Sequence, residues 1–215
     1  LYAEKSLRKT AEDMEFFGQF IADEKKQNRV ALFAAKQGFI AVEDKSGCNV
    51  HTQIIDTDKI KYKTYAFPKG TVLMVFDYAF GEQAYELMDE LLKTQLGQQL
   101  ESISIMGKAG IMKGKKGDIM VPTAHIFEGT SDNYPFYNDL SSEDFSDSKI
   151  PTLEGTMITV LGTSLQNKDI LTYFCRSSWK VIGIEMEGVH YQKAIQSAMH
   201  IRQTVRPDVK LRYAY

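Results

Sequence analysis

One stretch of the sequence, residues 71–106, carries two strand patterns and one helix pattern in a fixed order. The apolar run Val72–Phe76 predicts a strand that is buried on both faces. Ser102–Met106 predicts the next strand. Between Gly81 and Gly97 apolar residues recur at helical spacing: Ala84, Leu87, Met88, Leu91, Leu92 and Leu96. Gly97 is predicted to end this helix as its C′ residue. Strands that alternate with helices in this way form sheets covered by helices.

The same alternation continues to the end of the sequence. Strand patterns lie at Asp118–Pro122, Met157–Leu161, Val181–Ile184 and Val209–Tyr215. Helix patterns lie at Lys168–Cys175 and from Glu185-Met-Glu-Gly188 to about Gln203. The polar stretch Ser131–Lys149 is expected to be a solvated surface loop or a mobile loop near the site.

The first third of the chain has a different pattern. Residues 1–29 are charged and predict a helical N-terminal segment, and three β-like runs follow at Val30–Val42, Val50–Ile55 and Lys61–Phe67. We predict an α/β fold, one domain over residues 1–215, with a central mixed β-sheet flanked by helices.

The composition narrows the class of protein. With 26 Lys and Arg against 28 Asp and Glu, the net charge of −2 argues against binding to nucleic acid or to an anionic membrane. The apolar runs are far shorter than the ~20 residues that span a bilayer. The two cysteines and four histidines have no metal-ligand spacing, which favours a reduced, cytoplasmic protein without a bound metal.

The first candidate motif is a glycine-rich turn that follows a strand, Gly107-Lys-Ala-Gly110. Small residues in such a turn let a ligand approach the backbone, and their N–H groups can hold an anion. The segment matches neither the Walker A pattern nor GxGxxG. The alternative is a tight connection leading into a basic hairpin with Lys113, Lys115 and Lys116.

The second candidate motif is Glu185-Met-Glu-Gly188, directly after a buried strand. Open α/β sheets bind ligands at the carboxyl ends of their strands. A carboxylate there can accept hydrogen bonds from both hydroxyls of a ribose and can stabilise positive charge on a ribosyl ring. Alternatively, Glu185 and Glu187 only complement the dipole at a helix N-terminus.

Taken together, Gly107-Lys-Ala-Gly110, Gly117-Asp118 and Glu185-Met-Glu-Gly188 resemble the nucleoside phosphorylase/nucleosidase superfamily. That family includes purine nucleoside and uridine phosphorylases, methylthioadenosine/adenosylhomocysteine nucleosidases and AMP nucleosidases. The resemblance covers residues 61–215. The Glu-Met-Glu motif is the part of the resemblance that is specific to the family. The rest of the resemblance lies in the order and spacing of the segments.

The resemblance implies roles for individual residues. Glu187 would hold the ribose hydroxyls, Met186 would pack against the sugar, and Glu185 would support that carboxylate or the nucleophile. Substrate would also be bound by Ala109 and Gly110, which line the base and sugar pocket, and by the glycine turn at Gly81.

Lys108 departs from the family pattern, because many relatives have Ser or Thr in its place. An ammonium group there could still bind phosphate. The family's Ser-Asp, whose Asp protonates the leaving base, is not found by Tyr215, and we expect the general acid to lie beyond that residue. The family's phosphate- or water-binding loop is not recognisable either.

The resemblance implies cleavage of the N-glycosidic bond of a nucleoside or nucleotide by phosphate or water. A purine substrate is expected in preference to a pyrimidine. No cofactor is expected, and phosphate is an optional co-substrate. The resemblance also implies a homo-oligomer, a dimer or hexamer. A catalytically silent nucleoside-binding or scaffolding domain is the main alternative. A dinucleotide-dependent oxidoreductase ranks below both, because no GxGxxG opens a βαβ unit.

Overall fold

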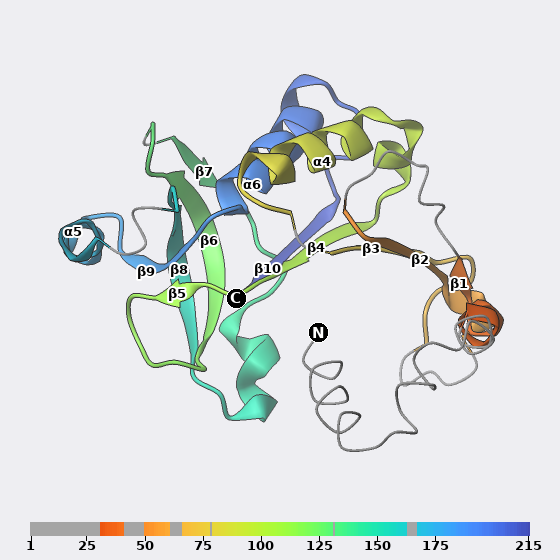
Figure 1. The fold of residues 1–215 in the computed structure, drawn as a ribbon, viewed down its shortest axis with the longest axis horizontal. Coiled ribbons are helices and arrows are strands. Elements are labelled where there is room, and N and C mark those ends of the chain that lie inside the picture. Colours follow the sequence, from red (N-terminus) through yellow and green to blue (C-terminus); the bar gives the residue numbers. More distant parts are fainter. Residues whose placement is uncertain (1–30, 41–49, 61–65, 78, 131, 163–166) are drawn as a thin grey trace, which may run out of the picture. The chain divides into compact units, whose positions relative to one another are not determined.

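The computed structural model describes residues 31–40, 50–60, 66–77, 79–130, 132–162 and 167–215 (Figure 1). The chain divides into two compact units, residues 1–78 and residues 79–215. The predicted helical segment over residues 1–29 lies outside the described residues, and the single domain over residues 1–215 stays a prediction.

The first unit contains a small antiparallel sheet. Its three strands are β1 (Phe39–Ile40), β2 (Thr52–Asp56) and β3 (Val72–Phe76), in the order β1-β2-β3. A 3-10 turn, η2 (Thr57–Lys59), follows β2, and the Asp56 carboxylate accepts a hydrogen bond from its Asp58 N–H at 3.1 Å.

Two predictions for this unit are wrong. Residues 31–36 are helical where the run Val30–Val42 predicted a strand. The segment Ala-Leu-Phe-Ala-Ala-Lys consists largely of good helix formers, and a short apolar run cannot by itself distinguish helix from strand. Strand β3 is present, but Val72 and Val75 are 53% and 46% exposed, so it is not buried on both faces. Of the run Lys61–Phe67, residues 61–65 lie outside the described part, and residues 66 and 67 have no regular structure.

The second unit contains two sheets. In the smaller, β4 (Ser102–Met106) runs parallel to β10 (Lys210–Ala214). The larger has the order β5-β9-β8-β6-β7. Its three central strands run parallel and its two short edge strands run antiparallel: β5 (Gly110–Ile111), β9 (Val181–Glu185), β8 (Thr152–Thr159), β6 (Ile119–Phe127) and β7 (Asn133–Pro135).

Hydrogen bonds join these two sheets at the end of β10. The backbones of Met120 and Tyr215 exchange two bonds, of 2.9 and 3.0 Å. The Asn138 side chain donates to the carbonyls of Pro122 in β6 and Tyr213 in β10, at 2.9 and 3.0 Å. The ends of β4 and β10 are therefore held beside β6, and the mixed α/β architecture predicted from the sequence is confirmed.

Two helices pack on each other in this unit, and a third lies apart from them (Figure 1). Helices α4 (Glu82–Lys93) and α6 (Gly188–Gln196) share a core with β4 and β10, whose fully buried members include Leu92, Ile195 and Tyr213. Helix α5 (Lys168–Arg176) instead packs through Phe174 on β8 and β9.

The predicted end of helix α4 is wrong, and that of α6 is close. Helix α4 ends at Lys93, and Gly97 lies in a 3-10 segment, η3 (Gln95–Gln99). A Cβ atom at Gly97 would lie 2.4 Å from the Thr204 carbonyl oxygen, so the glycine permits a close approach and is no helix C′ residue. Helix α6 (Gly188–Gln196) continues without a break as a π-helical segment, η6 (Ser197–Ile201), so the helical stretch ends close to the predicted end at about Gln203.

The polar stretch Ser131–Lys149 is more structured than a plain surface loop. Strand β7 pairs with β6, and a 3-10 segment, η4 (Ser142–Ser148), begins with a capping box between Ser141 and Asp144. Polar composition alone did not reveal this strand, because β7 has only three residues.

Candidate functional site

The Glu185-Met-Glu-Gly188 motif forms the junction between strand β9 and helix α6. Glu185 is the last residue of β9 and is only 4% exposed. Glu187 is the N-cap residue of α6 and is half-buried. The motif therefore lies at the carboxyl end of a strand buried along its whole length, as the sequence predicted.

The Glu185 carboxylate holds the first turn of α6. It accepts hydrogen bonds from the backbone N–H of Glu187 at 2.7 Å, from the N–H of Gly188, and from the Thr159 hydroxyl. Thr159 lies directly opposite Glu185 in the β8–β9 register, and its oxygen accepts the Val189 N–H at 2.9 Å. Both Glu185 oxygens are thus engaged within the protein, so this carboxylate does act at a helix N-terminus.

Burial changes the acidity of Glu185. Loss of solvent raises its pKa from 4.5 to about 7, although the hydrogen bonds from Thr159, Gly188 and Glu187 favour the ionised form and oppose that rise. Glu185 is therefore a group that titrates near neutral pH at the base of the motif.

The Glu187 carboxylate is held differently. Its Oε1 accepts the backbone N–H of Gly81 at 3.1 Å, and it forms no ion pair with any residue in the described part of the chain. Gly81 is the N-cap of α4 and has a φ of +49°, which a glycine adopts without strain. One half-buried carboxylate thus connects the N-termini of α4 and α6.

The Gly107-Lys-Ala-Gly110 turn reaches the same edge of the sheet. Gly110 pairs with Ile184, the residue before Glu185, and a Cβ at Gly110 would lie 2.8 Å from the Ile184 Cγ1. Ala109 is half-buried and packs on Met120, Met157 and Ile182. The structure therefore brings Ala109 and Gly110 beside the Glu-Met-Glu motif.

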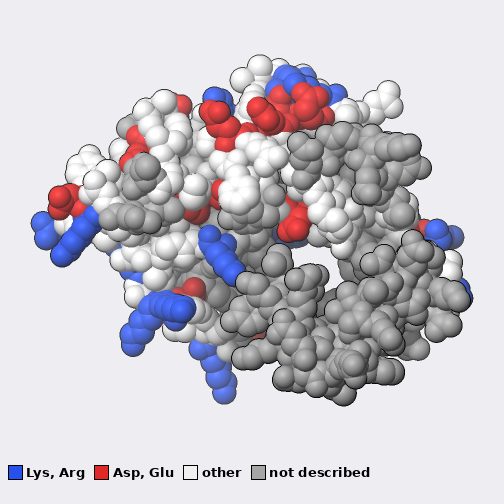
Figure 2. Space-filling view, in the orientation of Figure 1, with Lys and Arg blue, Asp and Glu red and all other residues white. Residues whose placement is uncertain are grey.

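Lys108 and Met186 occupy the outer part of this region. Lys108 is exposed and makes no ion pair within the described ranges. Lys113, Lys115 and Lys116, on the following turn, are exposed as well. Met186 is half-buried, with its Cε 3.4 Å from a Cβ built on Gly162. In Figure 2 the largest group of acidic side chains on the visible described surface lies along the top, and most of the basic side chains lie at the lower left.

Three residues around the motif were not identified from the sequence. Thr159 binds Glu185. His125 is fully buried in β6, and a Cβ at Gly188 would lie 2.3 Å from its ring. Tyr215 places its hydroxyl 3.3 Å from the His125 Nε2. A polar residue within an apolar strand pattern was the available signal for His125 and Thr159. Strand register places Thr159 opposite Glu185, and the packing of α6 on the sheet places His125 against Gly188.

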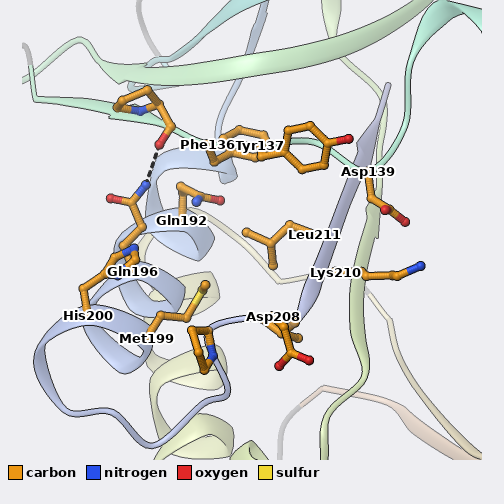
Figure 3. Close-up of a pocket in the computed structure, with 13 residues that line it drawn as sticks. Phe136, Tyr137, Asp139, Gln192, Gln196, Met199, His200, Asp208, Lys210 and Leu211 are labelled. Atoms are coloured by element: carbon orange, nitrogen blue, oxygen red, sulfur yellow. Dashed lines mark hydrogen bonds between the residues drawn. The ribbon is translucent and has the colours of Figure 1, made fainter.

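A cavity of about 450 Å³ lies elsewhere in this unit, at the other end of α6 (Figure 3). Two of its carboxylates are paired: Asp139 with Arg212 at 2.6 Å, and Asp208 with Arg206 at 2.7 Å. None of the residues predicted to bind substrate lines it. Its lining comes from the β7 segment, α6 with η6, and the start of β10: Pro135, Phe136, Tyr137, Asp139, Gln192, Gln196, Met199, His200, Pro207, Asp208, Val209, Lys210 and Leu211.

Metal-type clusters and membrane-spanning helices are both absent from the described residues. These residues contain no group of three His, Cys, Asp or Glu side chains arranged to hold a metal ion. Within the same residues, every helix is too short or too polar to cross a bilayer.

Comparison with known proteins gives one family and one fold. A model described as a family of unknown function, DUF6909, matches residues 9–214. No curated protein matches the sequence. Among solved structures, the methylthioadenosine/adenosylhomocysteine nucleosidase of Colwellia psychrerythraea 34H, in complex with adenine, superposes with a TM-score of 0.57 at 13% identity, covering 86% of this chain and 74% of that one.

Two further structures have the same fold. The futalosine hydrolase of Helicobacter pylori strain 26695 has a TM-score of 0.60 at 12% identity, with 85% and 78% of the two chains covered. The AMP nucleosidase of Bacteroides thetaiotaomicron VPI-5482 has a TM-score of 0.53 at 15% identity, with 87% and 73% covered. The predicted resemblance to the nucleoside phosphorylase/nucleosidase superfamily is confirmed at the level of fold.

Proposed function

The chain belongs to the family of unknown function DUF6909, and we propose that it cleaves the N-glycosidic bond of a purine nucleoside or nucleotide. The observation that carries this proposal is the Glu187 carboxylate. It is half-buried at the carboxyl end of β9, fixed by Gly81, and not neutralised by any described cation.

A carboxylate in this position suits both binding and catalysis. Its oxygens can accept hydrogen bonds from the two adjacent hydroxyls of a ribose. As the glycosidic bond breaks, positive charge develops on the sugar ring, and a fixed negative charge beside it lowers the energy of that state more than that of bound substrate. Glu187 is therefore proposed as the group that stabilises the transition state.

The residues around Glu187 are assigned supporting roles. Glu185 fixes the N–H groups of Glu187 and Gly188, which sets the direction in which Glu187 leaves the backbone. Met186 would pack against the sugar. Gly81, Ala109 and Gly110 would line the base and sugar pocket, because small residues let a ligand approach the backbone closely.

We favour water over phosphate as the attacking group. The similar structures named above are called nucleosidases or hydrolases. Lys108 is exposed beside the glycine turn and could hold a phosphate, either as co-substrate or as part of a nucleotide. We therefore expect turnover without added phosphate, and we expect the chain to self-associate as the resemblance implies.

Binding without turnover is the alternative, and one observation favours it. Both oxygens of Glu185 are occupied by protein donors, so within the described residues the motif offers one carboxylate, and no second one, to a substrate. A proton donor for the leaving base is still required for efficient cleavage, since general acid catalysis contributes about 10²- to 10⁴-fold.

The deciding experiment measures release of free base. The protein is incubated with adenosine, methylthioadenosine, AMP, inosine and uridine, with and without phosphate, and the products are separated by chromatography. Release of adenine or hypoxanthine without phosphate supports hydrolysis. Calorimetric binding of adenosine with no base released from any substrate supports the silent domain. A protein that neither binds nor cleaves these compounds contradicts both interpretations.

A further inference from the structure

His125 lies in the middle of β6 with none of its surface exposed. Its ring stacks on Phe136, with centroids 5.4 Å apart and an angle of 2° between the planes. Tyr213 and Tyr215 contact it at centroid distances of 5.0 and 6.2 Å. The imidazole is thus enclosed by aromatic rings on several sides, which restricts its movement.

The same ring touches the first turn of α6. A Cβ atom on Gly188 would lie 2.3 Å from the His125 Cδ2, 2.6 Å from its Nε2 and 2.8 Å from the Glu185 Oε1. Real Cβ atoms do not approach other atoms so closely, so only glycine leaves room for this ring. His125 and Gly188 are therefore matched in size at the residue that follows Glu187.

A hydrogen bond links the same edge of the ring to Tyr215, the residue that follows β10. The His125 Nε2 is 3.3 Å from the Tyr215 hydroxyl, and Nδ1 has no partner among the described residues. Burial lowers the pKa of His125 to about 3, so the ring is neutral at physiological pH. An unbonded acceptor is less costly than an unbonded N–H, which favours the tautomer with the proton on Nε2, donated to Tyr215.

From these contacts we propose that His125 is a positioning residue, which fixes the start of α6, and with it the Glu187 carboxylate, by packing on Gly188 and hydrogen bonding to Tyr215. This inference rests on the proposed function of Glu187. A ring that served only to fill the core would not need the polar contact to Tyr215.

The experiment is a double-mutant cycle between His125 and Gly188. Gly188→Ala forces the ring and the helix start apart and should lower kcat/KM for base release by about 100-fold, the cost of a small misplacement of a site group. His125→Ser alone removes the ring and should lower it by roughly tenfold. The double variant removes the contacts of the new methyl group with the ring and leaves only its 2.8 Å contact with the Glu185 Oε1. Its activity should therefore exceed that of Gly188→Ala alone, by up to about tenfold.

Two more variants of His125 distinguish a positioning role from a role in core packing and from a role in proton transfer. His125→Phe keeps the ring volume but not the bond to Tyr215, and we expect kcat to fall roughly fivefold with little change in melting temperature. His125→Gln, which restores a donor, should recover most of that loss. The pH–rate profile between about pH 5 and pH 8 should keep its shape in His125→Gln, because a neutral imidazole exchanges no proton there.

Specific results would overturn the proposal. If the effects of Gly188→Ala and His125→Ser simply add, the contact between these residues does not control the site. If the pH–rate profile of His125→Gln loses one of its limbs, His125 transfers a proton in the reaction. His200→Ser, at an exposed position of η6, is the control and should change nothing. If the unmodified protein releases no base, the proposed function fails.

In that case the same double-mutant cycle is measured with adenosine affinity and with melting temperature instead of kcat/KM. If the effects of the His125 and Gly188 substitutions add in both measurements, the positioning role is rejected independently of the proposed function.

Discussion

The two ends of helix α6 differ in what they leave unpaired. At the end that continues into η6 lies the 450 Å³ cavity, where Asp139 and Asp208 are each neutralised by an arginine. At the other end Glu187 is half-buried, is fixed by one N–H, and has no cation beside it in the described structure. A reactive site needs a group that is held by the protein and still able to bind something else. Volume alone does not supply such a group, so we place the chemistry at the Glu187 end.

Glu187→Gln tests this comparison most strongly. The amide keeps the size of the side chain but removes the charge that would stabilise a cationic sugar ring. We expect the rate of base release to fall by about 10²-fold or more, as with loss of other preorganised electrostatic groups. Stability should change by less than about 1 kcal/mol, the usual worth of a charge at a helix end. Normal turnover with a lowered melting temperature would show that Glu187 has only a structural role.

The pH dependence of stability tests how Glu185 is held. Its pKa is about 7 in the folded protein against 4.5 unfolded, so the folded state binds the proton more tightly between these values. The contribution of Glu185 should therefore be greatest below about pH 4.5 and decrease as the pH rises to about 7, in total by on the order of 3 kcal/mol.

His125 acts in the opposite direction and must be separated from Glu185. Its pKa is lowered to about 3, so its contribution to stability is present above about pH 6.5 and is lost as the pH falls toward 3. The measurement is the free energy of unfolding in urea for the natural protein minus that for Glu185→Gln, across this range. A difference that does not decrease with rising pH contradicts the raised pKa of Glu185.

Much of the fold follows from local patterns in the sequence. The strand–glycine–helix–strand order of residues 71–106 is present as predicted, because periodicity and glycine placement act over a few residues. One failure has a tertiary cause and the other a local one. Position 97 requires a glycine because the Thr204 carbonyl approaches it too closely for a side chain. In residues 31–36 the helix propensity of the side chains prevails, although the apolar run is equally compatible with a strand.

The site shows the same division between local and distant information. Glu185, Met186 and Glu187 are consecutive, so a motif reveals them together. Thr159 reaches the motif through the parallel register of β8 with β9, and His125, in β6, reaches it by packing against Gly188. Without knowledge of strand order, neither residue could be assigned to the motif, and a buried histidine is unremarkable in a core pattern.

Thr159→Val should produce the next largest effect. The hydroxyl accepts the Val189 N–H and donates to Glu185, so an isosteric methyl group leaves two buried polar groups without a partner. Each such loss costs about 1–3 kcal/mol, and we expect the free energy of unfolding to fall by roughly 2 kcal/mol. Thr159→Ser keeps the hydroxyl and serves as the matched control. Equal stability of the Val and Ser variants, measured by urea denaturation, would show that this hydrogen-bond pair is not important.

Lys210→Ala should have the smallest effect, and it tests the other end of the comparison. Lys210 is exposed at the rim of the cavity and forms no ion pair among the described residues, while its backbone N–H stays bound to Glu101 in any variant. An exposed side chain away from special features changes stability little, so base release should remain within about twofold of normal. If Lys210→Ala lowers kcat/KM as much as Glu187→Gln does, the substrate occupies the cavity, and the unpaired carboxylate at the opposite end of α6 is not where the chemistry occurs.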